Sequence, residues 1–316
     1  MVERTAMRRT LFSQVVPGCL LLAWFAGSGC SIHRYALNQA SNAVAQSGST
    51  YASDDDPELI KAAAPFGLKL TESLLAENPR HLGLLTSAAS GFTQYSYAFV
   101  QEDADEVEPH DFAAAETMRV RAKHLYLRAQ RYGMRGLEVK HPGFGKALLA
   151  NPKATVRAAT KSDVPLLYWT AAAWASTISL SKDNPELVGQ IPAMEALMDR
   201  ALELDEGFNH GAIHTFMITY EMSRSGAAGD PAARAREHFE RAMALSKGVD
   251  ASPLVAFAEA VAVQKQDVKE FESLLNRALA INPDANPDLR LLNTVMQRRA
   301  RWLLSRESEL FLVESK

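Results

Sequence analysis

From residue 57 onward, apolar residues recur at spacings of three and four positions, which place side chains on one face of an α-helix. No stretch alternates apolar and polar residues convincingly enough to predict a strand. Breaks such as Asn78-Pro79 and Asn282-Pro283 divide the pattern into segments. We therefore predict an all-α protein with helices over residues 57–77, 81–101, 111–139, 141–150, 151–160, 164–181, 184–191, 194–204, 209–223, 230–245, 253–263, 268–281 and 287–311.

The region before these helices is polar and rich in small residues. We expect a short helix near residues 32–46 and a loose linker over residues 47–53. Asp54, Asp55 and Asp56 then precede Pro57. An Asp at the cap and a Pro in the first turn are typical of a helix start. The alternative interpretation of the three Asp residues is a cation site.

A short repeat recurs along the second half of the chain. The sequence RALEL at residues 200–204 returns as RAMAL at 241–245 and RALAI at 277–281, with a weaker copy, RGLEV, at 135–139. The first two intervals are 41 and 36 residues, close to the period of about 34 residues of tetratricopeptide repeats. The upstream spacing agrees, because Ala235, Phe239 and Ala242 match the positions of Phe271, Leu275 and Ala278.

A small residue at a fixed position lets two helices approach closely, while large residues four and seven positions away from it fill the groove between them. We therefore predict degenerate tetratricopeptide-like repeats that form an α-solenoid. The last helix carries Arg290, Arg298, Arg299, Arg301 and Arg306 and suits a polar cap of that solenoid. The alternative is ordinary Ala- and Leu-rich helical packing without a solenoid.

The N-terminus has the order of a secretory signal. Arg4, Arg8 and Arg9 precede an apolar run over residues 11–26, and the small residues at 27–29 lead to Cys30. A cysteine at this place predicts a lipoprotein signal in which Cys30 is acylated and becomes the new N-terminus. Gly27 departs from the usual Leu three positions before the cysteine, so an ordinary cleaved signal is the alternative.

Arg8-Arg9 also resembles a twin-arginine export signal. Ser31 stands where an inner-membrane retention signal tends to place Asp, which favours the outer membrane. The second cysteine, Cys19, lies in the signal, so the mature chain would hold no free thiol and no disulfide. The predicted organisation is a signal peptide over residues 1–29, a lipidated polar linker with a short helix over 30–53, and a helical-repeat domain over 54–316.

Charge and composition limit the function. Residues 30–316 carry 31 Lys and Arg against 36 Asp and Glu, a net charge of −5 that argues against nucleic-acid binding. The acidic residues over 102–108 are expected to form a solvated loop, the alternative being a surface for a basic partner.

No known catalytic motif occurs in the sequence, so we predict no enzyme activity, no cofactor and no metal. His210 and His214 have a spacing of four residues that could ligate a metal with Glu221 as a third ligand. Polar lining of a groove and structural histidines are the favoured alternatives.

Aromatic residues suggest a binding groove instead. Tyr168, Trp169 and Trp174 lie in one predicted helix. If Tyr168 and Ile213 hold the first core position of their repeats, one concave face collects Trp169, Ser176, His214, Glu221, Thr86, Ser90 and Gln94. Such a face would be apolar with a few polar groups, as ligand sites usually are. The alternative places Trp169 and Trp174 in the core.

Segments 124–144, 163–187, 200–215 and 235–245, together with the run YWTAAAW at 168–174, resemble the TatT family. This family is the periplasmic lipoprotein component associated with tripartite ATP-independent periplasmic (TRAP) transporters. The resemblance implies degenerate tetratricopeptide motifs, a homotrimer with openings through the protomers, and docking to the substrate-binding P component. This sequence departs from the family pattern at Gly27 and in the loop over residues 226–231.

Two functions follow from these observations. The first is a periplasm-facing, lipid-anchored accessory component of a TRAP transport system that binds the P component and a small hydrophobic or organic-acid ligand. The second is a tetratricopeptide-like scaffold lipoprotein of the outer-membrane or cell-envelope assembly.

Overall fold

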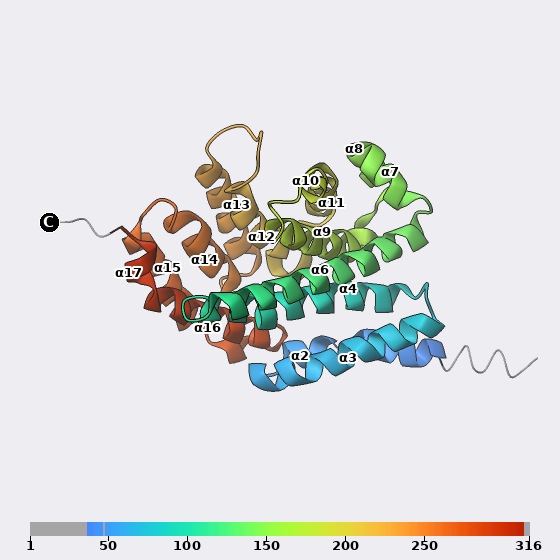
Figure 1. The fold of residues 1–316 in the computed structure, drawn as a ribbon, viewed down its shortest axis with the longest axis horizontal. Helices are drawn as coiled ribbons and strands as arrows, with labels where there is room; N and C mark the ends of the chain where they lie inside the picture. Colours follow the sequence, from blue (N-terminus) through green and yellow to red (C-terminus); the bar gives the residue numbers. More distant parts are fainter. Residues whose placement is uncertain (1–36, 47, 313–316) are drawn as a thin grey trace, which may run out of the picture.

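The computed structural model describes residues 37–46 and 48–312, and every regular element within these residues is helical, as predicted. Figure 1 shows the helices packed side by side. The first half comprises helix 37–46, α2 (Gly48–Ala52), α3 (Pro57–Glu77), α4 (Leu82–Ser96), α5 (Glu102–Val107), α6 (Phe112–Lys140), α7 (Phe144–Ala150), α8 (Pro152–Thr155) and α9 (Val164–Ser179). The second half comprises α10 (Pro185–Val188), α11 (Ile191–Leu204), α12 (Ala212–Glu221), α13 (Pro231–Leu245), α14 (Ser252–Phe257), α15 (Val268–Ala280), α16 (Arg290–Ser305) and α17 (Glu307–Leu310).

Short 3₁₀ and π segments extend or join these helices. The π segments are η1 (Tyr97–Gln101) and η5 (Ala258–Ala262). The 3₁₀ segments are η2 (Val156–Ala158), η3 (Lys161–Asp163), η4 (Phe208–Gly211), η6 (Pro283–Ala285) and η7 (Pro287–Leu289).

The predicted start of α3 is confirmed. The side chain of Asp56 accepts hydrogen bonds of 3.0 Å from the backbone N–H groups of Glu58 and Leu59, and Pro57 is the first helical residue. Asp54 accepts a further bond of 2.8 Å from the N–H of Asp56. These bonds satisfy donors that the first turn of a helix leaves free. Asp54 and Asp56 thus have a structural role at the helix start.

The segment before α3 is more ordered than the expected loose linker. Gly48–Ala52 is helical, and helix 37–46 is bonded to the domain, since Asn78 donates to Asn38 over 2.7 Å. The hydroxyl of Tyr51 fills the space beside Gly67 of α3 where a Cβ would lie. Polar side chains on a short segment do not prevent docking when the neighbouring helix offers matching polar groups and a glycine.

The acidic residues over 102–108 form helix α5 and the turn after it, so the predicted solvated loop is wrong. Glu102 and Asp103 are buried. Basic side chains of α3, α6 and α16 surround the acidic group: Lys61 bonds Asp103 at 2.6 Å, Arg119 bonds Glu108 at 2.7 Å, and Arg298 bonds Glu106 at 2.6 Å. The charges that suggested a loop are paired within the chain, which removes most of the cost of burying them.

The prediction that the last helix is a polar cap is also wrong for two of its arginines. Arg299 is only 6% exposed; it pairs with Asp105 at 3.1 Å and with Glu259, and its guanidinium lies 4.3 Å from the ring centre of Trp302. Arg298 pairs with Asp103 and Glu106 of α5 and is only partly exposed to solvent. Helix α16 is therefore held against α5 by buried and partly buried ion pairs.

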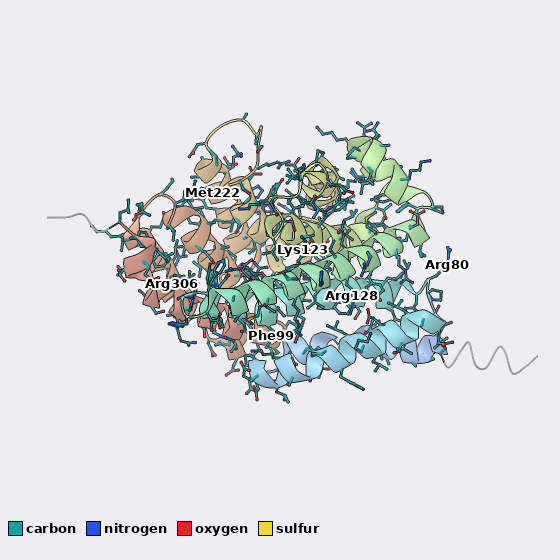
Figure 2. The ribbon with its side chains drawn as sticks, in the orientation of Figure 1. Arg80, Phe99, Lys123, Arg128, Met222 and Arg306 are labelled. Carbon is teal, nitrogen blue, oxygen red and sulfur yellow. The ribbon has the colours of Figure 1, made fainter. Side chains whose placement is uncertain are left out.

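The core comprises two apolar clusters. One joins α3, α4 and the first part of α6 to α13–α16, and the other lies among the end of α6, α7, α9, α11 and α12. Helices α6 and α9 cross closely at Gly133 and Gly136, where a Cβ would collide with the side chains of Thr170 and Leu166. The small residue of the weakest repeat copy, Gly136, thus has the predicted role in a helix crossing. Figure 2 shows Arg128 between α6 and α3, where it lies 3.6 Å from Glu72.

The repeats themselves bury their small residues as predicted, because Ala201, Ala242 and Ala278 are fully buried. Consecutive helices pair as α9 with α11, α12 with α13, and α14 with α15. The chain also closes on itself, since α16 contacts α2 and α3 and Arg290 donates to the carbonyl of Ser53 over 3.0 Å. Repeats of an open solenoid touch only their neighbours, so this closure departs from that arrangement, and the tetratricopeptide-like solenoid stays a prediction.

Candidate functional site

A cavity of about 410 Å³ lies between the first helix, the beginning of α4 and the region where α6 ends and α9 begins. We call it the polar groove. It is open to solvent on one side. The residues that line it are Asn42, Ala45, Gln46, Gly48, Leu82, Gly83, Thr86, Ser87, Ser90, Lys140, Ser162, Pro165 and Leu166.

One wall of the polar groove is a face of α4. Leu82, Thr86 and Ser90 have a spacing of four residues and therefore share that face. Thr86 donates its hydroxyl hydrogen to the carbonyl of Leu82 over 3.0 Å, and Ser90 donates to that of Ser87 over 3.2 Å. A hydroxyl that donates to its own helix keeps its acceptor lone pairs. This wall consequently presents acceptors to a ligand.

His81 and Gly83 hold the first helix beside that wall. The Nδ1 atom of His81 accepts from the N–H of Leu84 over 3.1 Å and so caps α4, while Nε2 lies 3.1 Å from Oδ1 of Asn42. A Cβ on Gly83 would lie 3.2 Å from the Cβ of Ala45, so the missing side chain permits the close approach. Helix 37–46 forms the second wall because of these contacts.

The third wall contains Lys140, the only titratable side chain among the lining residues that the structure describes. Its ammonium group donates to the hydroxyl of Ser162 over 2.8 Å and pairs with the fully buried carboxylate of Asp163. Asp163 also accepts from the N–H of Thr160 over 2.7 Å and lies 3.3 Å from Nε2 of His141. Burial raises the pKa of Asp163, but the hydrogen bonds from Lys140 and Thr160 outweigh it and hold the pKa below its ordinary value.

This arrangement suits binding more than bond chemistry. An ammonium group has three N–H donors, and Lys140 uses two of them for Ser162 and Asp163. The third can bond a ligand oxygen. Hydroxyls and amides supply the other polar groups, and Ala45, Leu82, Pro165 and Leu166 supply an apolar floor.

The structure separates the residues that sequence analysis gathered into one groove. Thr86 and Ser90 line the polar groove, whereas Gln94 is exposed beyond it. Trp174 is buried in the core, and its indole N–H donates to Gln190 over 3.1 Å. Tyr168 is buried as well; its ring packs edge-on against Trp169, which is half-buried, with 4.8 Å between ring centres.

His214 and Glu221 lie on α12, away from the residues of the polar groove. His214 is bonded to His238 and lies 3.4 Å from Glu206, and Glu221 accepts from Arg224 over 3.0 Å and from Arg234 over 2.5 Å. His210 precedes α12 in a left-handed backbone conformation with φ of 58°, so it does not share a helix face with His214. The spacing of four residues therefore does not bring the two histidines together.

Sequence analysis missed Lys140, Ser162 and Asn42. A signal existed for part of this wall, because Thr160 and Asp163 have the spacing of a capping box, and both of its hydrogen bonds are present. Nothing in the periodicity indicated that the first helix would lie across α4. Within the described residues, no cluster of three His, Cys, Asp or Glu side chains is suited to a metal ion. Nor does any helix there combine the length and apolar character needed to cross a membrane.

Comparisons with known proteins agree with the resemblance. The family model of the TRAP transporter T-component, TAtT, matches residues 53–311. An uncharacterised protein of Treponema pallidum (strain Nichols) is 27% identical over 312 residues, which cover 93% of this chain and 95% of the relative. The family match spans nearly all of the described helices. The chain therefore belongs to the TRAP transporter T-component family.

Proposed function

We propose that this protein is a lipid-anchored, periplasm-facing accessory component of a TRAP transport system that binds the P component and holds a small organic acid in the polar groove. The family match over residues 53–311 carries the accessory role. This family is not a class of enzymes, which agrees with a binding function. Cys30 supplies the anchor in this proposal, with the outer membrane as the favoured location.

The polar groove supports the choice of an organic acid. The third donor of Lys140 bonds a ligand carboxylate, since its other two donors are used by Ser162 and Asp163. Hydroxyl groups of the ligand meet the free lone pairs of Thr86 and Ser90. Because the charge of Lys140 is already balanced by Asp163, the groove selects ligands of low charge over polyanions.

Calorimetric titration of the mature protein with a panel of small mono- and dicarboxylic acids tests the ligand. Lys140→Met removes a hydrogen bond to a charged group, and such bonds contribute about 1.5–3 kcal/mol. We expect affinity to fall roughly 10- to 100-fold. Lys146→Met is the matched control, because Lys146 is exposed on α7, and this variant should keep wild-type affinity.

Lys140→Met also removes the ion pair between Lys140 and the buried Asp163, so a second variant separates binding from folding. Thr86→Val keeps the shape of the side chain and removes its acceptor without touching Asp163. We expect it to weaken binding several-fold with an unchanged melting temperature. Equal affinities of wild-type, Lys140→Met and Thr86→Val proteins would remove the polar groove as the ligand site.

The partner is tested by co-purification. Mature protein is captured from periplasmic extract and eluted partners are identified by mass spectrometry, with purified P component titrated in parallel. We expect a periplasmic solute-binding protein and a trimer mass by light scattering. Repeated recovery of outer-membrane or cell-wall proteins without any solute-binding protein would instead support an envelope scaffold.

A further inference from the structure

Helix α3 carries large apolar side chains on the face that points away from the core. Leu59 is 56% exposed, Phe66 is 75% exposed and Leu70 is 39% exposed. Their spacings of seven and four residues put them on one side of the helix together with Ala62. The opposite side buries Ile60, Ala64, Leu68 and Leu75 in the first core cluster. An exposed apolar stripe of this kind marks a contact site.

Charged side chains flank the stripe without interrupting it. Lys69 pairs with Glu72 at 2.6 Å, and Lys61 reaches inward to Asp103 at 2.6 Å. The stripe is therefore apolar along its centre, and Lys69, Glu72 and the exposed Glu58 lie at its edges. Such a helix face fits a shallow position at a membrane surface, where apolar side chains enter the boundary between head groups and acyl chains.

The position of the chain end relative to α3 selects the membrane as the occupant. Helix 37–46 is bonded to the end of α3 through Asn38 and Asn78. Seven peptide units separate Cys30 from residue 37, and they span at most about 25 Å. Phe66 lies 12 residues before Asn78, or roughly 18 Å along the helix axis. Figure 1 shows α3 at the lower edge of the molecule, beside the segment where the described chain begins.

A second copy of the chain is a weaker candidate for this face. The stripe is one helix wide, and three side chains cannot by themselves supply the roughly 800 Å² per partner that a stable protein interface buries. A lipid anchor, in contrast, gains from even a small second contact with the bilayer. We propose that the outer face of α3, centred on Phe66, lies against the bilayer that holds the acylated Cys30. This inference rests on the lipid anchor of the proposed function.

Site-directed spin labelling on vesicles tests the contact. With Cys30 acylated, Phe66→Cys introduces the one free thiol of residues 30–316. The lipidated variant is reconstituted on phosphatidylcholine vesicles, labelled with a nitroxide, and exposed to oxygen or to a water-soluble nickel chelate. Oxygen concentrates in the bilayer and the chelate is excluded from it. We expect the label at residue 66 to gain oxygen accessibility and to lose at least half of its nickel accessibility on vesicles.

Phe112→Cys is the matched control, since Phe112 is 65% exposed on α6, and α4 lies between α6 and α3. Its label should keep the same nickel accessibility with and without vesicles. Unchanged nickel accessibility at residue 66 on vesicle-bound protein would overturn the α3 contact while leaving the anchor intact. Shielding of residue 66 in a vesicle-free Cys30→Ser background would assign the face to a second copy and overturn the inference. Wild-type protein that does not sediment with vesicles would overturn the anchor and this inference together.

Discussion

The imidazole rings of His214 on α12 and His238 on α13 share a hydrogen bond of 2.8 Å between their Nδ1 atoms. One Nδ1 must donate and the other accept, so both rings cannot be doubly protonated while the bond persists. Burial lowers the pKa of both histidines, although Glu206 acts in the opposite direction on His214. The pair links two helices of the predicted repeats and responds to acid.

The first prediction concerns stability in mild acid. Because the folded protein holds the pKa of His238 below the ordinary value of 6.5, the unfolded chain binds more protons below that pH. The contribution of the histidine pair to the free energy of unfolding is thus present above pH 6.5 and is lost as the pH falls below this value. We expect the urea midpoint of His238→Asn to fall less than that of the wild type between pH 7.5 and pH 5.

The charged side chains around the histidine pair are Glu206, Glu221, Glu237, Arg224 and Arg241, and salt screens their effect on it. Each pH series is therefore run at constant ionic strength. His124→Asn on the exposed face of α6 is the control and should follow the wild-type curve. Parallel curves for His238→Asn and the wild type would contradict the role of the pair.

The second prediction concerns Glu102, whose Oε1 atom is buried without a hydrogen-bond partner. Burial raises its pKa to about 8, and Arg299 opposes this only in part. The folded protein therefore binds more protons than the unfolded chain between pH 4.5 and 8, so stability falls as pH rises through this window. At pH 8.5 we expect Glu102→Gln to be more stable than the wild type by on the order of 1–3 kcal/mol.

Chemical denaturation at pH 5.5 and pH 8.5 measures this difference. Glu77→Gln, on the exposed end of α3, should change stability equally little at both values. A Glu102→Gln protein that is less stable than the wild type at pH 8.5 would show that the ionised carboxylate is a net stabilising partner of Arg299.

The third prediction concerns the crossing of α6 and α9. Replacing Gly by Ala inside a helix usually stabilises it by roughly 0.5–1 kcal/mol. At Gly133 the added Cβ would instead collide with the side chain of Thr170. We expect Gly133→Ala to lose about 1–3 kcal/mol in urea denaturation. Gly145→Ala in α7 meets only an ordinary contact of 3.5 Å with Met134 and should be neutral or stabilising.

The fourth prediction concerns Arg299. Removing one partner of a buried ion pair costs about 3–5 kcal/mol, because the remaining charges stay buried without compensation. We expect Arg299→Ala to lose stability of this order, because Glu259 loses its ion-pair partner and Asp105 keeps only Arg119. Arg301→Ala, two residues away and exposed, should change stability by less than about 0.5 kcal/mol. Similar melting temperatures for the two variants would show that the ion pairs of buried Arg299 do not stabilise the fold.

Much of the local structure follows from residues close together in the chain. Pro57 and Asp56 marked the start of α3 correctly because a helix cap is made by its own neighbours. Ala201, Ala242 and Ala278 were correctly predicted to be buried because a small residue at a helix crossing has a fixed spacing from the large residues around it. The family resemblance, carried by segments throughout the sequence, is confirmed as well.

The candidate site could be predicted only in part. Thr86 and Ser90 were assigned from their helix face to a concave groove shared with Trp169 and His214, whereas in the structure they line the polar groove with Lys140 and Asn42. Lys140 and Asn42 were missed, because the distance between them in sequence hides their approach in space. Trp169 and His214 were grouped with Thr86 by assuming ideal repeat phasing, which the short elements between α9 and α12 do not maintain.

The sequence by itself determined which residues are helical, where most helices begin and which small residues allow close packing, since these depend on interactions within a few turns. Tertiary structure alone decided that residues 102–108 form a buried helix, that α16 returns to the first helices, and that Lys140 faces Thr86 across the polar groove. These outcomes depend on charges and contacts brought together from distant segments. Arg298 and Asp103 illustrate the physical reason, because they are 195 residues apart in sequence and 3.1 Å apart in space. An unpaired charged side chain favours solvent, whereas the same side chain can be buried once it is paired with an opposite charge.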